Sequence, residues 1–294
     1  MSVVTNLLCR GAGLLKWSKP LFTRVGTRGV GSTTTAQQAD EDILRNAQKQ
    51  NQQTRIDLAT SYRAMEYYNL HMGVCNHLTA LCPAANGEGT VMLLVPHGTH
   101  WSQVTASCLL GLNEKGEVVE GNGRAETSAA EIHMAVYDAR DDVKSVMHTH
   151  APYLTALGAL KDCTLRMIHQ DSMRFYNNVA YDTEYDGFAT TGEEGPRIAS
   201  KLGDKISLIL GNHGVVTVGP TVAVAFDHMY YMERVAMYQM LAMQTGGELQ
   251  EIKPQVAARW SLLQEGEPFM LPYAETHLQG FKNLYAKKCP EVLM

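Results

Sequence analysis

Apolar and polar positions change their period several times along the chain. Residues 40–69 begin with acids and then carry apolar side chains at three- and four-residue spacing, which predicts a helix. Helical spacing returns later, at 129–139, 155–160, 193–202 and 221–243. Short apolar runs bounded by turn residues predict strands at 77–81, 90–95, 108–112, 118–119, 143–150, 207–210 and 215–218. Residues 161–188 show no clear period.

The order of these elements indicates one layered domain. Strands and helices alternate without a regular βαβ rhythm, so we expect an α/β fold in which helices cover a central sheet. We place this domain at residues 40–245. Residues 246–294 are more polar and interrupted by prolines, and we expect a partly helical C-terminal extension there.

The first 39 residues have a different composition from the rest. They contain five basic residues and no acidic residue, and they end in a stretch rich in Gly, Ser and Thr. This combination is typical of a mitochondrial transit peptide, so we expect targeting to the mitochondrial matrix and exclude the segment from fold reasoning. A tail without targeting information is the alternative.

Charge and composition exclude several classes of partner. The formal net charge of -5 provides no basic field for nucleic acid. No apolar run approaches the ~20 residues that a membrane-spanning helix needs. Six cysteines occur, none in a CxxC pair, and we interpret them as reduced thiols.

Three histidines follow strand-like runs and indicate a metal site. His148 and His150 are two residues apart at the end of one run, so their side chains lie on one face of a strand. His213 follows the apolar run 207–210, beside Gly214. Three imidazoles with a fourth position open are typical of a catalytic metal site. Imidazole suits Zn²⁺, Fe²⁺ and other divalent transition metals, and histidines that merely pack at strand ends are the alternative.

The motifs around these histidines resemble the class II aldolase/adducin N-terminal domain family. Residues 132–150, which end in His-Thr-His, and residues 210–214, Leu-Gly-Asn-His-Gly, are similar to two family elements. Residues 95–101 and 76–79 match earlier elements in the right order, so the resemblance covers about residues 50–245. The resemblance implies a three-layer α/β/α domain with a mainly antiparallel sheet. It also implies a homotetramer with sites between subunits, and Zn²⁺ held by His148, His150 and His213.

The proton-transfer acid of the family's sugar-phosphate aldolases has no counterpart here. Ala129 stands at that position, and alanine cannot move a proton. Glu126 and Glu131 are the candidate replacements for the acid, although Glu131 is rotated ~200° around the helix from Ala129. Tyr153, just after the histidine pair, is a further candidate acid, with packing as the alternative.

The expected substrate contacts also depart from the aldolase pattern. The early loop lacks the family's arginine, and the phosphate-binding turn becomes His97-Gly98. On the matching positions we expect substrate contacts from His77, Thr79, His97, Gly98 and Ser128. Tight phosphate recognition is therefore not expected. His133, four residues after Ala129, is expected to pack within the fold.

Three functions remain open from the sequence. The first is a metal-dependent lyase that cleaves or decarboxylates a small hydroxy- or oxo-acid, or an unphosphorylated sugar-like carbonyl compound. The second is a catalytically silent, adducin-like oligomerising domain with an actin-cytoskeleton partner, which the replacement at Ala129 favours. The third is a non-haem iron oxygenase, because three neutral ligands also suit Fe²⁺.

Overall fold

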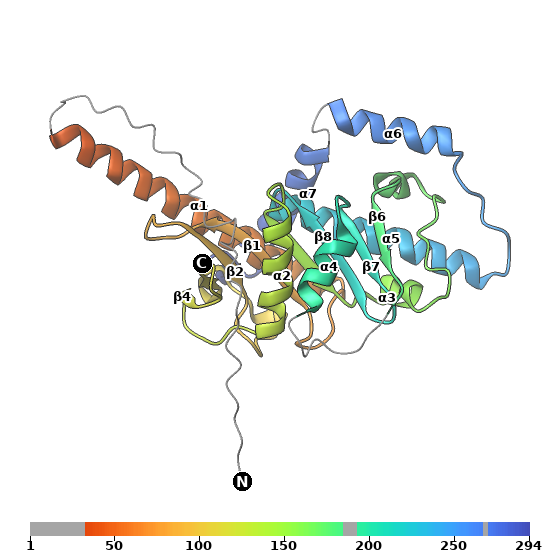
Figure 1. Cartoon of the computed structure of the whole chain (residues 1–294), viewed down its shortest axis with the longest axis horizontal. Helices are drawn as coiled ribbons and strands as arrows, with labels where there is room; N and C mark the ends of the chain where they lie inside the picture. Colours follow the sequence, from red (N-terminus) through yellow and green to blue (C-terminus); the bar gives the residue numbers. More distant parts are fainter. Residues whose placement is uncertain (1–32, 185–192, 267–269) are drawn as a thin grey trace, which may run out of the picture.

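The computed structural model describes residues 33–184, 193–266 and 270–294 (Figure 1). Its strands are β1 (His77–Pro83), β2 (Thr90–Leu94), β3 (Leu110–Leu112), β4 (Val118–Glu120), β5 (Ser145–Thr149), β6 (Val179–Asp182), β7 (Ser207–Leu210) and β8 (Gly214–Gly219). Its α-helices are α1 (Thr33–Tyr67), α2 (Thr127–Ala139), α3 (Pro152–Gly158), α4 (Glu194–Leu202), α5 (Val222–Gln244), α6 (Pro254–Gly266) and α7 (Met270–Lys288). Short 3₁₀ turns are η2 (Trp101–Gln103), η3 (Ala106–Cys108), η4 (Gln170–Phe175) and η5 (Pro290–Leu293).

All eight strands form one sheet in the order β4-β3-β2-β1-β5-β8-β7-β6. Every neighbouring pair is antiparallel except β6 and β7, which are parallel. The expected α/β fold with a mainly antiparallel sheet is thereby confirmed. The central strands β1, β5 and β8 are buried along their length, as their apolar sequences require.

Helices cover both faces of this sheet and produce three layers (Figure 1). On one face α1, α5 and α7 bury a core that includes Leu58, Phe226 and Leu278. On the other face α2 and α4 bury a second core that includes Val136 and Leu202. The sheet therefore separates two hydrophobic cores, and side chains at its strand ends lie near both.

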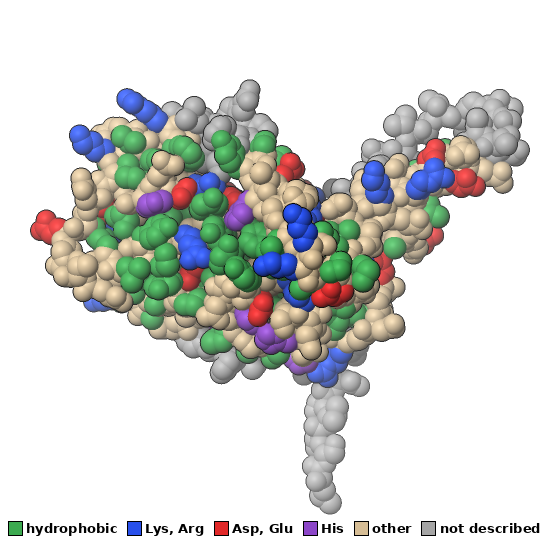
Figure 2. All heavy atoms as spheres, turned by 180° about the vertical axis from the view of Figure 1, so that it is seen from behind, with side chains coloured by type: hydrophobic (Ala, Val, Ile, Leu, Met, Phe, Trp, Pro, Cys, Tyr) green, Lys and Arg blue, Asp and Glu red, His purple; other side chains and the backbone are tan. Residues whose placement is uncertain are grey.

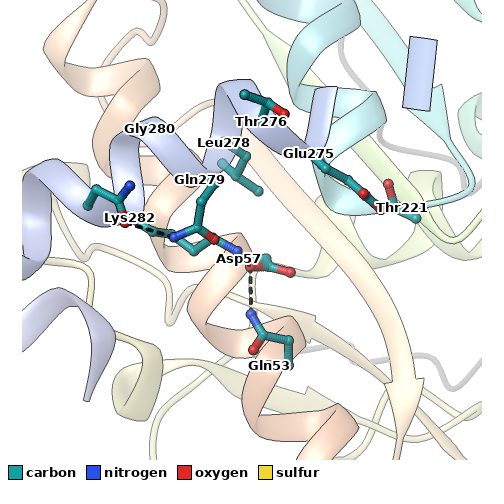
Figure 3. A pocket seen from close by; sticks show the side chains of 11 residues that line it. Gln53, Asp57, Thr221, Glu275, Thr276, Leu278, Gln279, Gly280 and Lys282 are labelled. Carbon is teal, nitrogen blue, oxygen red and sulfur yellow. Dashed lines mark hydrogen bonds and ion pairs between the residues drawn. The ribbon is translucent and has the colours of Figure 1, made fainter. Parts of the chain in front are cut away.

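The C-terminal helix α7 is part of the first core. Leu278 and Phe281 are buried against α5 and α1. Across an open groove Lys282 Nζ lies 2.8 Å from Asp57 Oδ1 on α1 (Figure 3). The extension expected at 246–294 thus contains helices, and its second helix packs within the same fold as the preceding domain.

The structure differs from the sequence expectations at three elements. Helix α1 begins at Thr33, before the expected start at Asp40. Helix α3 begins at Pro152, because a proline is tolerated in the first turn of a helix. Residues 161–188, left unassigned, contain η4 and β6. None of the helices in the described ranges is long and apolar enough for a bilayer span.

Candidate metal centre

Three histidines converge where β5 and β7 end and β8 begins. His148 lies in β5, His150 follows it, and His213 lies in the turn between β7 and β8. One ring nitrogen from each lies within 4.8 Å of the others. The ring centroids are 4.8 to 5.1 Å apart. The structure therefore brings together the three residues that the sequence identified as metal ligands.

The β7–β8 turn has a backbone that allows this convergence. Asn212 has a φ of 55°, a left-handed conformation that asparagine adopts more readily than most residues. A Cβ atom on Gly214 would lie 2.5 Å from the Thr149 carbonyl oxygen and 2.8 Å from a ring carbon of His150. Glycine at 214 thus permits the close approach of the turn to β5, which carries His213 to the other two imidazoles.

The hydrogen bonding of the triad leaves nitrogen lone pairs for a cation. His148 Nδ1 donates to the Val215 carbonyl oxygen at 3.1 Å, which leaves Nε2 unprotonated in the neutral ring. Both ring nitrogens of His150 are buried and have no hydrogen-bond partner among the described residues. Buried polar atoms without partners are costly, and coordination removes that cost. The residues present therefore fit a divalent transition-metal ion.

Electrostatics keep the triad in its neutral, metal-binding form. Burial lowers the pKa of His148 well below its usual range, with further lowering by His77 and His213. Burial also lowers the pKa of His150. The pKa of His213 falls to about 4 because of burial, then because of His150 and Arg197. All three imidazoles are unprotonated near neutral pH, as metal ligands must be.

Two residues that the sequence analysis did not assign to the site hold the loop after β5. The side-chain oxygen of Asn76 accepts the backbone N–H of His150 at 3.2 Å. Glu233 on α5 is buried and accepts the backbone N–H groups of Tyr153 and Leu154, each at 2.9 Å. Burial raises the pKa of Glu233 to about 7. The available signal was an acid within the largely apolar sequence of α5, which also contains Asp227.

A chain of four buried polar side chains lies beside the triad. His77 Nδ1 is 2.8 Å from His133 Nε2, and His133 Nδ1 is 2.6 Å from Thr79 Oγ1. Thr79 Oγ1 is in turn 2.7 Å from the Tyr137 hydroxyl. The His77 ring lies 4.9 Å from that of His148. We name this set, His77, His133, Thr79 and Tyr137, the polar chain.

The polar chain changes the expected role of Thr79. Its hydroxyl is fully buried and engaged by His133 and Tyr137, so it does not face a ligand. Thr79 lies on β1 where this strand pairs with β5, and this position explains why its hydroxyl is buried. His133 is packed within the fold, as expected from its place on α2.

A small pocket lies next to His77. Its volume is about 20 Å³, and its lining includes His77, His97, Gly98, Glu126 and Ala129. Glu126 Oε2 accepts the backbone N–H of Ala129 at 2.6 Å and so caps α2. Of the two acids considered as replacements near Ala129, Glu126 shares this pocket.

Glu131 and Tyr153 are not brought to the triad. Glu131 is exposed and lines a separate groove with Met134 and Asp138, because it points away from the sheet on α2. The Tyr153 side chain packs at the edge of the first core, and within the described ranges no interaction joins its hydroxyl to the triad. The side chain of Ser128 lies outside the part of the structure that is described.

Arg197 on α4 is a cationic neighbour of the site that the sequence did not indicate. It contributes to the lowered pKa of His213. Its guanidinium is paired with the buried Asp182 and lies 3.7 Å from Glu194. Its charge is thus already balanced by carboxylates.

Comparison with known proteins places this geometry in context. Residues 56–240 match the model of the Class II Aldolase and Adducin N-terminal domain. One relative is a Caulobacter vibrioides protein named as an aldolase class 2 protein. It is 32% identical over 206 residues, which cover 70% of this chain and 78% of the relative. Alpha-adducin of Mus musculus is 34% identical over 197 residues, which cover 66% of this chain and 26% of the adducin.

A solved structure agrees with these similarities. The aldolase II superfamily protein from Pseudomonas syringae has a TM-score of 0.74 and 27% identity, over 83% of this chain and 96% of that one. Its similarity extends beyond the matched domain and includes most of the described fold. The family assignment and the architecture are thus supported independently.

Proposed function

Because the chain belongs to the class II aldolase and adducin N-terminal domain family, we propose that it is a metal-dependent lyase. The substrate is a small hydroxy- or oxo-acid, or an unphosphorylated sugar-like carbonyl compound, which is cleaved by a retro-aldol reaction or decarboxylated. The observation that carries the proposal is the triad, in which both buried nitrogens of His150 lack a hydrogen-bond partner within the part of the chain that the structure describes.

Different residues of the chain would hold the metal ion and transfer the proton. His148, His150 and His213 would hold Zn²⁺, with Fe²⁺ as the alternative, and the cation would act as a Lewis acid toward carbonyl and hydroxyl oxygens. Glu126 is the acid that we propose to accept or return a proton, because it lines the same pocket as Ala129. Its carboxylate already accepts an N–H bond at the start of α2, which fixes its position.

The charges around the site favour a substrate without a phosphate. No lysine or arginine is among the described residues that line the small pocket. Arg197, the nearby cation, is paired with Asp182. Phosphate recognition usually needs charge-assisted donors such as arginine, so a carboxylate or a neutral hydroxyl compound fits better.

We further propose that copies of the chain assemble into a homotetramer in the mitochondrial matrix. Large hydrophobic residues are exposed on α5, among them Tyr238, Leu241 and Met243. Figure 2 shows hydrophobic side chains spread over the rear face, interspersed with basic, acidic and histidine side chains. Apolar surface of this kind marks interaction sites. Light scattering of the purified chain, and import of the chain into isolated mitochondria, test the two parts.

A silent adducin-like scaffold is the second candidate, and the replacement of the acid by Ala129 favours it. An iron oxygenase is the third, because the neutral triad also suits Fe²⁺. The scaffold and the oxygenase would have the same fold as the lyase, but they would differ from it in which metal, if any, they bind and in which reaction, if any, they catalyse.

Elemental analysis followed by a substrate screen separates these functions. The purified full chain should hold about one zinc per chain and should cleave or decarboxylate at least one small carbonyl compound. His148→Ala should abolish both, whereas His100→Ala, on an exposed loop, should abolish neither. Iron with oxygen consumption would instead identify the oxygenase. A chain that binds no metal and turns over no compound would contradict the lyase and favour the scaffold.

A further inference from the structure

The polar chain has a direction that its buried end determines. Tyr137 is 1% exposed, and burial raises its pKa, so the phenol keeps its proton. A backbone hydrogen bond from Val146 lowers the same pKa, as an N–H that donates to the phenol oxygen does. Among the described side chains, the Thr79 hydroxyl is the group hydrogen-bonded to this phenol. Tyr137 therefore donates to Thr79.

The remaining protons follow from this first donation. Thr79 accepts from Tyr137, so it donates its own proton to His133 Nδ1. Burial lowers the pKa of His133 to about 3, and the ring is neutral with its proton on Nε2. His133 Nε2 then donates to His77 Nδ1. Because His77 Nδ1 accepts this hydrogen bond, the ring proton of His77 lies on Nε2. The opposite direction would leave the phenol proton without an acceptor in the core.

The protonated nitrogen of His77 lies on the side of the ring away from His133. The His77 ring is 4.6 Å from His133 and 4.9 Å from His148, so it stands between the polar chain and the triad. It also lines the pocket of about 20 Å³ that Glu126 and Ala129 share. A space of this size holds about one water-sized group, such as a hydroxyl or carbonyl oxygen.

We propose that His77 presents a fixed Nε2–H donor to an oxygen atom of the substrate bound at the metal triad. Thr79, His133 and Tyr137 are positioning residues that hold His77 in this tautomer. A neutral N–H aimed at an oxygen stabilises negative charge that develops there when a carbon–carbon bond breaks. The inference rests on the proposed lyase function for its substrate, while the tautomer itself is independent of that function.

Nitrogen NMR of the histidine rings tests the tautomer directly. The full chain, labelled with ¹⁵N in histidine and loaded with zinc, gives long-range proton–nitrogen correlations, in which the His77 signals are assigned with His77→Gln. The expected result is a proton on Nε2 of His77. In Tyr137→Phe, which removes only the terminal donor, this preference should weaken or reverse. A proton on Nδ1 of His77 in the wild-type chain would overturn the proposal, whatever the activity.

Binding of glycolate tests the contact with an oxygen ligand. The chain is loaded with Co²⁺, and glycolate is titrated while the visible absorption of the metal is recorded. His77→Leu should weaken binding about tenfold, as the loss of one hydrogen bond does. His77→Gln retains an amide donor near the Nε2 position and should stay within about threefold of wild type. Equal affinities in the wild type and His77→Leu would overturn the proposed contact.

The two proposals fail in different ways. If the tautomer and the glycolate series behave as expected but no carbonyl compound is turned over, the donor assignment stands and the lyase function fails. If turnover is found but His77 carries its proton on Nδ1, the lyase function stands and the donor assignment fails.

Discussion

Two clusters that contain histidines lie side by side, the polar chain on β1 and α2 and the triad around the end of β5, and they differ in how their ring nitrogens are hydrogen-bonded. In the polar chain, His133 uses both ring nitrogens in hydrogen bonds to His77 and Thr79. In the triad, both nitrogens of His150 are buried, and no described residue forms a hydrogen bond with them. Burial is common to both clusters, so the unpaired nitrogens, and not the burial, indicate a binding site. The members of the polar chain are hydrogen-bonded to one another, and the chain orients His77 beside that site.

Removing a triad imidazole gives the largest expected effect. Loss of a residue that supports a metal ligand costs about 10- to 100-fold in affinity, so loss of the ligand itself in His150→Ala should exceed about 100-fold. Competition with a chelator measures the affinity, and elemental analysis the stoichiometry. His100→Ala serves as the control, because His100 is exposed and outside the triad. Equal losses in both variants would remove the distinction between the triad and other histidines.

Substitution in the polar chain should affect stability more than metal content. His133→Leu leaves His77 Nδ1 without its donor and the Thr79 proton without its acceptor, while Tyr137 still bonds Thr79, which should lower the free energy of unfolding by roughly 4 kcal/mol. Tyr137→Phe removes one hydroxyl and should cost about 1 kcal/mol. Urea denaturation measures both, and zinc should remain near one per chain. A loss of zinc without a loss of stability in His133→Leu would place His133 with the ligands.

The buried acid Glu233 should make the stability of the protein depend on pH. Its folded pKa of about 7 lies above the unfolded value of 4.5, so the native state favours the protonated carboxyl. The contribution of this protonated carboxyl to the free energy of unfolding is fully present below pH 4.5. It is lost as the pH rises through 7, a change of about 3 kcal/mol. Unfolding free energies at a series of pH values should show the decline in wild type relative to Glu233→Gln, which has no titrating group there. Parallel pH curves for the two proteins would show that Glu233 is not the origin.

A methyl group at 214 should disturb the triad through sterics alone. Gly214→Ala places a Cβ 2.5 Å from the Thr149 carbonyl oxygen, so the β7–β8 turn must move away from β5. We expect a loss of about 2 kcal/mol in stability, together with weaker zinc binding, because His213 moves with the turn. Gly280→Ala on α7 is the control, since a Cβ there meets no atom within 4 Å. Unchanged zinc affinity in Gly214→Ala would mean that the ligands tolerate this shift.

Periodicity and motif spacing anticipated most of this structure. Strand β5, which carries His148, and strand β7, which precedes His213, are short runs with several apolar residues, and their burial follows from that pattern. Strand β6 was not anticipated, because it is short, only partly buried, and held by parallel pairing with β7. Local sequence carries little information about such pairing.

The polar chain was hidden from the sequence for a related reason. Thr79 and His133 are 54 residues apart and meet only after β1 and α2 pack on each other. Glu126 and Glu131 likewise could not be ranked from spacing alone. Only the fold shows that Glu126 faces the pocket of His77, whereas Glu131 faces solvent.

The position of α7 has a consequence for the order of events during biosynthesis. Phe281 packs with residues of α1 and α5, and the Ser107 N–H donates to the carbonyl oxygen of Met294 at 2.7 Å. These contacts join parts of the polypeptide that leave the ribosome far apart in time. The first core therefore cannot close until the residues of α7 have emerged, and an earlier nascent chain exposes apolar surface that a chaperone would have to cover.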